Sequence, residues 1–286
     1  MLRIGWFSTG RDRDALTLFS KVHKAIQEGF LEDVEISFVY CNREPGEFPE
    51  SDEFMAYVKK CNVPLIYLSH RKFMPKLRER GLEESKRGVG SQALEKWREM
   101  YDRRLEKLIQ NYSVDLNMLA GYMLILSEYF TRRHVMINLH PAPPGGPKGT
   151  WQEVIWETIK RRLSEAGCMM HVVTENLDEG PPATYCTFPL RGPKFDGLWR
   201  EVDEKLESLS FEELKAAEGE ENPLFKAIRR EEFKRETPLI IETLKAMSQQ
   251  RIRIDDGTRM VLVDGKASKR GLCLNREVEK HLGSEA

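Results

Sequence analysis

The sequence lacks the features of a secreted, membrane-spanning or zinc-binding protein. Its 286 residues include five cysteines, an odd number with no C-x-x-C spacing. This usage argues against a disulfide framework or a zinc site and favours a reducing cytoplasm. No apolar run reaches transmembrane length, and the chain opens on a strand-like segment without a signal-peptide pattern. We therefore expect a cytoplasmic protein without a bound metal and without a membrane partner.

An excess of charge of one sign is also missing. The chain has 45 basic and 46 acidic residues, a formal net charge of -1. Proteins that bind nucleic acids usually carry a clear basic excess, so we expect no nucleic-acid partner. The first turn has no G-x-G-x-x-G, which argues against a dinucleotide oxidoreductase. Hydrophobic residues make up 40% of the chain, enough for a sizeable core.

Apolar periodicity in the first half predicts strands that alternate with helices. The predicted strands lie near residues 2–8, 34–40, 63–68, 115–120 and 134–139, and the predicted helices near 13–29, 54–61 and 94–111. This order predicts an α/β fold with a doubly wound, mostly parallel sheet. Ligands of such sheets bind beyond the carboxyl ends of the strands, here residues 9–14, 121–126 and 138–150. The charged residues 70–90 predict a surface excursion.

The second half has a different pattern. It predicts strands at 168–174 and 183–189 and helical segments at 194–218 and 223–247. Thr237-Pro238 is typical of a helix start, because Thr can cap a helix and Pro suits its first turn. Asp255-Asp256-Gly257 predicts a hairpin turn. We expect a main domain at residues 1–190 and a helical and β-hairpin C-terminal extension at residues 191–286 packed on it.

Two polar residues stand at the end of a predicted buried strand. Asn138 and His140 precede a loop rich in proline and glycine, at the ligand-binding edge of the sheet. Asparagine offers an amide donor, and histidine exchanges protons near neutral pH. A second strand contains His171 and leads into an acidic turn with Asp178. Each segment alone is typical of an ordinary strand end, so a chemical role depends on their combination.

Together with the Ala-Gly-Tyr-Met strand end that begins at Ala120, these segments resemble the folate-dependent formyltransferases, the family typified by glycinamide ribonucleotide formyltransferase. The resemblance covers residues 1–190 and includes the segments 7–10 and 97–102. It implies a formyltransferase-type Rossmann-like fold with catalysis in this first domain. The co-substrate would be 10-formyltetrahydrofolate, the partner a small-molecule amine acceptor, and no metal is implied.

The resemblance implies that Asn138, His140 and Asp178 are catalytic. Asn138 and a protonated His140 would donate hydrogen bonds to the formyl oxygen as it gains charge. His140 and Asp178 would relay a proton through a water. A carboxylate near His140 is expected to raise the pKa of the imidazole. His171 matches a histidine of the family, and a buried structural role fits it as well.

The resemblance also implies binding residues for both substrates. Those expected to bind the folate are Tyr122, Met123, Leu124, Ile125, Leu126 and Arg98. Those expected to bind the acceptor are Gly10, Arg11 and Asp12. Here the sequence departs from the family's phosphate-binding loop: two carboxylates repel a phosphate, whereas two arginines attract one, and Asp12 also fits a helix cap. The altered loop after His140, with Lys148, predicts a different acceptor or a differently shaped lid.

Several alternatives stay open at this stage. The acceptor is glycinamide ribonucleotide, as in purine biosynthesis, or another amine such as an amino sugar. Hydrolysis of 10-formyltetrahydrofolate would use the same residues, with water in place of the amine. A non-catalytic folate or nucleotide binder has no need of all three catalytic residue types. Residues 70–90 and 191–286 either cover the site or build a homodimer contact.

Overall fold

The structure, a computed structural model, describes residues 1–88 and 90–284; Val89 of the predicted excursion and residues 285–286 of the predicted extension lie outside the described residues. The strands are β1 (Leu2–Ser8), β2 (Val34–Cys41), β3 (Leu65–Tyr67), β4 (Leu116–Leu119), β5 (Met136–His140), β6 (Glu165–Val172), β7 (Pro182–Pro189), β8 (Ile252–Ile254), β9 (Val261–Val263), β10 (Lys266–Ala267) and β11 (Leu272–Cys273). The helices are α1 (Arg13–Gln27), α2 (Pro49–Lys60), α3 (Pro75–Lys86), α4 (Gln92–Ile109), α5 (Glu128–Arg133), α6 (Trp151–Lys160), α7 (Asp196–Leu206), α8 (Phe211–Glu218), η1 (Gly219–Glu221), α9 (Pro223–Ser248) and α10 (Asn275–Ser284).

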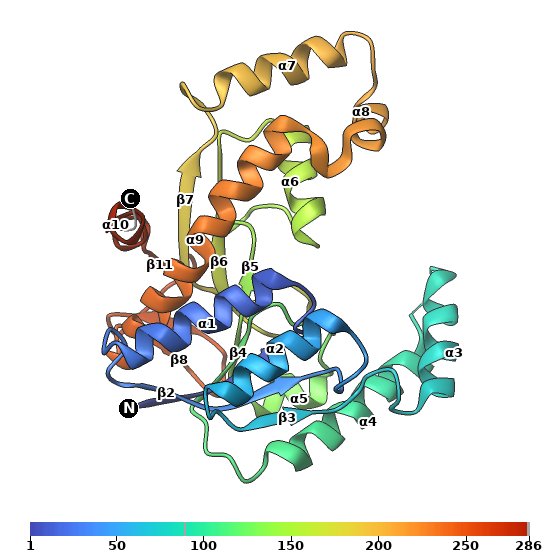
Figure 1. Ribbon diagram of the computed structural model, residues 1–286, viewed down its shortest axis with the longest axis vertical. Helices are drawn as coiled ribbons and strands as arrows, with labels where there is room; N and C mark the ends of the chain where they lie inside the picture. Colours follow the sequence, from blue (N-terminus) through green and yellow to red (C-terminus); the bar gives the residue numbers. More distant parts are fainter. Residues whose placement is uncertain (89, 285–286) are drawn as a thin grey trace.

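A central sheet has the strand order β11-β7-β6-β5-β4-β1-β2-β3 (Figure 1). The five adjacent strands β3, β2, β1, β4 and β5 run parallel to one another. β6 runs antiparallel to both β5 and β7, and β11 pairs in parallel with β7. The predicted mostly parallel α/β fold is therefore confirmed. β8, β9 and β10 form a second, antiparallel sheet, which confirms the predicted hairpin around Asp256.

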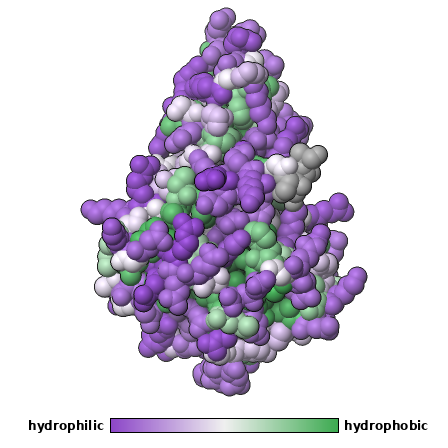
Figure 2. All heavy atoms as spheres, turned by 90° about the vertical axis from the view of Figure 1, so that its left-hand side faces the viewer, coloured by the Kyte–Doolittle hydropathy of each residue, from purple (hydrophilic) through white to green (hydrophobic). Residues whose placement is uncertain are grey.

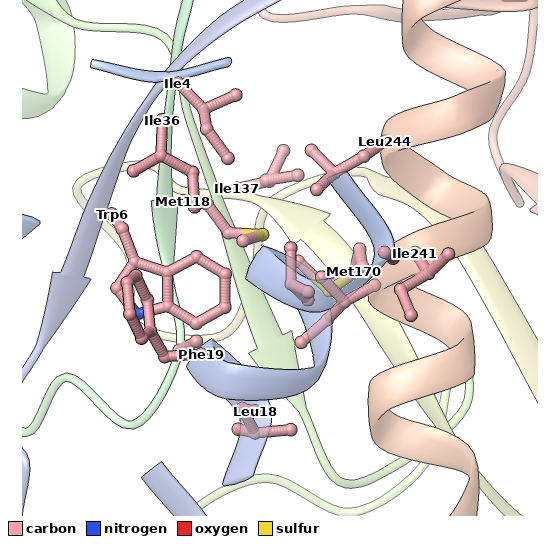
Figure 3. Close-up of a cluster of buried hydrophobic side chains, with 14 of the residues drawn as sticks. Ile4, Trp6, Leu18, Phe19, Ile36, Met118, Ile137, Met170, Ile241 and Leu244 are labelled. Carbon is pink, nitrogen blue, oxygen red and sulfur yellow. The ribbon is translucent and has the colours of Figure 1, made fainter. Parts of the chain in front are cut away.

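Helices cover both faces of the central sheet. On one face, Leu18 and Phe19 of α1 and Ile241 and Leu244 of α9 point toward apolar side chains of the strands (Figure 3). On the other face, α4 contributes Trp97, Tyr101 and Leu105 to a cluster that also contains the strand residues Phe7, Phe38 and Tyr40. A third cluster joins α6, α7, α8 and the first half of α9 beyond the ends of β6 and β7. The C-terminal segment therefore shares the main core through α9.

The predicted start of a helix at Thr237-Pro238 is wrong. α9 begins at Pro223, where the side chain of Asn222 accepts a hydrogen bond from the backbone N–H of Phe225 at 3.0 Å. Thr237 and Pro238 lie inside this helix and are buried. Proline removes one backbone hydrogen bond from a helix interior. The neighbouring Leu239 and Ile240, both fully buried in the main core, keep the segment helical.

The predicted excursion at residues 70–90 contains the helix α3, which lies beside α4 (Figure 1). Its one buried residue is Gly81, where a Cβ atom would lie 2.6 Å from the backbone nitrogen of Leu94. The space-filling view shows a mainly hydrophilic face with separate hydrophobic areas (Figure 2). Among the described helices, none has the length and apolar character needed to span a bilayer.

Candidate active site

The carboxyl ends of β1, β4 and β5 meet around one cavity of about 370 Å³. The backbone N–H of Thr9 donates to the carbonyl of Gly121 at 2.9 Å, and the Thr9 hydroxyl accepts from the N–H of Met123 at 2.9 Å. These bonds join the loops that follow β1 and β4. Gly121 has a φ of +69°, a conformation that glycine adopts without the steric penalty of a Cβ atom.

His140 ends β5 and is buried at the floor of this cavity. Its Nε2 lies 2.9 Å from the backbone carbonyl of Pro147, in the loop that folds back over it. A carbonyl only accepts hydrogen bonds, so Nε2 holds the proton of the neutral ring. Nδ1 is then the basic atom, and it faces Asp178 with 3.8 Å between Nδ1 and Oδ2.

Asp178 lies between two histidine rings. Its Oδ2 faces His140, and its Oδ1 lies 3.6 Å from Nε2 of His171. The backbone of Asp178 has a φ of +54°, an uncommon left-handed conformation. The turn then returns to β7 through Gly180, where a Cβ atom would lie 1.6 Å from the carbonyl oxygen of Val172. Local backbone strain at a residue whose side chain can take part in acid-base chemistry is typical of functional sites.

Asn138 is positioned by the neighbouring strand β6. Its Nδ2 donates to Nε2 of His171 at 3.2 Å, while Nδ1 of His171 lies 3.0 Å from the carbonyl of Val172. The carbonyl therefore fixes the His171 tautomer, and His171 in turn orients the Asn138 amide. The amide side chain has a second hydrogen that it can donate toward the cavity. His171, which also fits a purely structural role, lies within the site.

The charge state of His140 differs from the expectation. Burial lowers the pKa of the imidazole, and this effect outweighs both the hydrogen bond to Pro147 and the charge of Asp178, which raise it. Asp178 thus has the expected raising effect, but burial sets the net direction, because Asp178 is too far for a direct hydrogen bond and the ring is enclosed. For Asp178, burial acts to raise the pKa, but the rings of His171 and His140 outweigh it and lower the pKa. A neutral His140 beside an ionised Asp178 is suited to accept a proton.

An apolar wall flanks these polar groups. Tyr122, Leu124 and Ile125 line both this cavity and a smaller neighbouring one, and Leu126 lines the smaller one. Met123 and Ile125 are 48% and 40% exposed, which is unusual for large apolar side chains. Asp102 of α4 anchors the end of the loop that carries these residues, because its carboxylate accepts a hydrogen bond from the N–H of Ser127 at 2.6 Å. The wall is thus an open apolar surface beside the catalytic candidates.

The structure brings most, but not all, of the predicted binding residues to the cavity. Arg11 and Asp12 line it, whereas Gly10 does not. Arg98 lies on α4, half-buried, and lines neither this cavity nor its smaller neighbour. The lining also includes residues outside the predicted stretches, among them Trp151, Arg229 and Glu236. Asp14 lies next to the predicted acceptor loop, but no local pattern connects it with Arg229 on α9.

Arg229 connects the C-terminal segment to the cavity. Its guanidinium donates to Glu236 at 2.6 Å and to Asp14 at 2.7 Å, and it lies 4.7 Å from the ring centroid of Trp151. Burial acts to lower the pKa of Arg229, but the two carboxylates outweigh burial and raise it. Arg229 therefore stays charged and links α9, α1 and α6 at one point.

One further ion pair lies at the edge of the site. Lys148, in the altered loop after His140, donates to Glu179 at 2.7 Å and so links the loop after β5 to the turn after β6. Across residues 1–88 and 90–284, no three histidine, cysteine, aspartate or glutamate side chains converge in a geometry that would hold a metal ion.

Comparisons with known proteins identify the fold and the family. The sequence model of the family described as formyl transferase matches residues 14–187. The phosphoribosylglycinamide formyltransferase of Saccharomyces cerevisiae is 35% identical over 94 residues, which cover 30% of this chain and 44% of that protein. The enzyme of the same name from Escherichia coli is 34% identical over 95 residues, covering 32% and 44%. The matched segments thus span less than half of these relatives.

Solved structures share the fold over a larger part of the chain. The phosphoribosylglycinamide formyltransferase of Coxiella burnetii superposes with a TM-score of 0.63 at 20% identity and covers 95% of this chain and 98% of that one. The formyltetrahydrofolate deformylase of Burkholderia mallei has a TM-score of 0.56 at 14% identity and covers 92% and 69%. At these identities the likeness concerns the fold.

Proposed function

The chain belongs to the formyl transferase family, and we propose that it transfers a formyl group from 10-formyltetrahydrofolate to the amine of a small acceptor. The observation that carries the proposal is the convergence of three side chains. Asn138 and His140 come from the strand β5, Asp178 comes from the turn after β6, and all three meet at one cavity. A family match alone would not require these three residue types at one strand edge.

The apolar wall supports a folate site. The flat, mainly apolar ring system of a folate requires a slot with backbone hydrogen-bonding groups. Tyr122, Leu124 and Ile125 offer such a surface between the two cavities, next to Asn138. The exposure of Met123 and Ile125 fits a surface that a ligand would cover. We assign Leu126 to the inner end of this slot; Arg98 has no support as a folate contact.

The catalytic proposal assigns one task to each polar side chain. When bound, 10-formyltetrahydrofolate supplies the formyl carbon that the acceptor amine attacks. Asn138 donates its free amide hydrogen to the formyl oxygen as that oxygen gains negative charge. Donors of this kind are worth roughly 10² to 10³ in rate. His171 holds the Asn138 amide in the orientation that this requires.

His140 transfers the proton, and Asp178 stabilises the charge that the ring gains. In the neutral ring, Nδ1 of His140 accepts the proton that the amine loses as its nitrogen bonds to the formyl carbon. Asp178 stabilises the resulting imidazolium through its charge. His140 then returns the proton to the folate nitrogen as the bond from the formyl carbon to that nitrogen breaks. A positioned acid or base of this type contributes roughly 10² to 10⁴ in rate.

The cellular setting and the assembly are proposals as well. We place the protein in the cytoplasm, which is supported by its free thiols at Cys41, Cys61, Cys168, Cys186 and Cys273. Cys168 and Cys186 face each other at 3.5 Å between Sγ atoms on adjacent strands and are not joined. A homodimer contact through α3 or the C-terminal extension stays a prediction.

The test is the release of tetrahydrofolate from 10-formyltetrahydrofolate, followed spectrophotometrically. Glycinamide ribonucleotide is the first acceptor to assay, because the relatives carry its name, and an amino sugar is the second. Release that depends on an amine supports the transferase. Release at an equal rate without any amine would establish the alternative, hydrolysis by water with the same residues. No release with either class of amine would contradict the proposed function.

A further inference from the structure

The cavity is also lined by residues outside the apolar folate wall that the proposed chemistry does not use. The start of α1 supplies Asp12 and Asp14, α6 supplies Trp151, and α9 supplies Arg229 and Glu236. Trp151, Arg229 and Glu236 lie far from the first loop in sequence, yet Arg229 bonds directly to Asp14. We call this surface, made of Asp12, Asp14, Trp151, Arg229 and Glu236, the acceptor wall.

The positive charges along the cavity are already neutralised. The two arginines that line it are each paired with an aspartate of the first loop: Arg11 with Asp12 at 3.6 Å and Arg229 with Asp14 at 2.7 Å. Both terminal nitrogens of Arg229 donate to carboxylates, and its side chain is only 17% exposed. An incoming anion would have to displace Asp14 from Arg229.

The start of α1 is also occupied. The amino end of a helix is a ready site for phosphate, because its N–H groups lack partners within the helix. Here the side chain of Asp12 takes that position and accepts a hydrogen bond from the N–H of Ala15 at 3.1 Å. A phosphate approaching this end would meet a carboxylate in place of free donors.

The charge balance of the lining points in the same direction. The two arginines face five carboxylates along the cavity: Asp12, Asp14, Glu153, Asp178 and Glu236. Opposite charges attract and like charges repel most strongly in a partly enclosed site, where water screens them least. The cavity therefore favours neutral or cationic ligands over anions.

We propose that the acceptor wall selects an amine that carries no phosphate and whose distal end bears hydroxyl groups or a second cationic group. The inference rests on the proposed function, since it concerns the acceptor of that same reaction. Asp12 and Asp14, which are partly exposed, receive the distal hydroxyl or ammonium group. Trp151 and Arg229 form the flat side of the subsite, and Glu236 holds Arg229 in place from behind.

The experiment compares matched amines that differ only in a phosphate. Glycinamide riboside is titrated against glycinamide ribonucleotide, and glucosamine against glucosamine 6-phosphate, by calorimetry with the full chain in the presence of tetrahydrofolate. In each pair that binds, we expect the phosphate-free amine to bind at least about tenfold more tightly than the phosphorylated one at low salt. At high salt the ratio of the two dissociation constants should be smaller, because salt screens the repulsion. Tighter binding of the phosphorylated member would overturn the inference, and so would failure of both phosphate-free amines to bind.

A charge variant makes the test specific. Asp12→Asn/Asp14→Asn keeps side chains that cap a helix and donate or accept hydrogen bonds, but removes two negative charges. It is expected to shift the binding ratio toward the phosphorylated amine by about tenfold or more, whereas Asp33→Asn, in the turn before β2, leaves the ratio unchanged. An unshifted ratio in the double variant would contradict the inference. Because binding is measured without turnover, amines that bind but are never formylated would refute the proposed transferase and leave the acceptor wall standing.

Discussion

Oδ2 of Asp178 lies 3.8 Å from Nδ1 of His140, on the side of the ring that faces away from Pro147. The distance is too long for a direct hydrogen bond and short enough for a strong electrostatic effect. The ring is buried and its pKa is lowered, so the neutral form with a free Nδ1 is the ground state. The pair is therefore arranged to receive a proton and to stabilise it after transfer.

Replacing His140 by alanine should remove turnover while folate binding is largely kept. The ring lies on the floor of the cavity, whereas the apolar wall from Tyr122 to Leu126 supplies the folate surface. The expected loss in kcat is roughly 10² to 10⁴. Single-turnover release of tetrahydrofolate and a fluorescence titration with folate measure the two effects. His23→Ala on α1 is the control; loss of folate binding together with unfolding would make His140 structural.

Asp178→Asn should lower kcat more than it changes KM, because the carboxylate acts on the imidazolium formed during the reaction. The pH dependence of kcat gives a second, independent test of this role. Asp178 raises the pKa of His140 against the larger effect of burial, so its removal lowers that pKa further. The acidic limb of kcat, set by protonation of His140, should then move to lower pH. Unchanged turnover, or a limb that moves to higher pH, would remove Asp178 from the proton relay.

Ile125→Ala should raise KM for 10-formyltetrahydrofolate by about tenfold and leave kcat nearly unchanged. The side chain is 40% exposed at the cavity, and covering it with a ligand is worth about 1 kcal/mol or more. A loss of this kind affects ground state and transition state equally, so it appears in KM. Met260→Ala, at an exposed methionine away from the cavity, is the matched control. An equal KM for the two variants would place the folate elsewhere.

The sequence was sufficient for the elements whose apolar side chains recur with a clear period. The strands β1, β2, β4 and β5 and the helix α1 follow such patterns, and they alone bring Asn138 and His140 to the sheet edge. At α3 the sequence predicts only a surface excursion, because the one buried residue of this helix is Gly81, which leaves no apolar period to detect. Thr237-Pro238 resembles a helix start locally, and only burial against the sheet shows that α9 passes through it.

The site could be predicted only as far as local motifs reach. Asn138, His140 and Asp178 stand in recognisable segments, and all three line one cavity of the structure. Arg229 is 215 positions from Asp14, so their ion pair is a product of the tertiary fold. The same limit explains why the prediction for Arg98 has no support: it belongs to the recognisable segment 97–102, but it lies on α4 outside the cavity lining. The pKa of His140 also depends on enclosure that no motif specifies.

Asp102→Asn should stabilise the protein above neutral pH. An unfolded aspartate titrates near 3.8, whereas burial raises the pKa of Asp102 to about 7. Between these values the folded chain keeps a proton that the unfolded chain has lost, so stability falls as pH rises through this window and stays low above it. Asparagine retains an acceptor for Ser127, and at about pH 8 we expect a gain on the order of a few kcal/mol. Urea unfolding at about pH 8 and about pH 4 tests this; a gain that persists at low pH would contradict the titration of Asp102.

Arg229→Met should destabilise the fold by about 3 kcal/mol, because it leaves the carboxylate of Glu236 buried without its partner. Glu232 lies close by, fully buried, with a pKa that burial raises and Arg229 lowers, so the arginine counters two buried acids. In Arg229→Met/Glu236→Gln the unpaired charge is gone, and part of the stability should return. Arg161→Met removes an exposed pair with Glu157 and should cost at most about 1 kcal/mol. Urea unfolding of the four proteins separates these cases. If Arg229→Met cost no more than Arg161→Met, the link between α9 and the first loop would carry no stability, and the acceptor wall would have to be held by the apolar core alone.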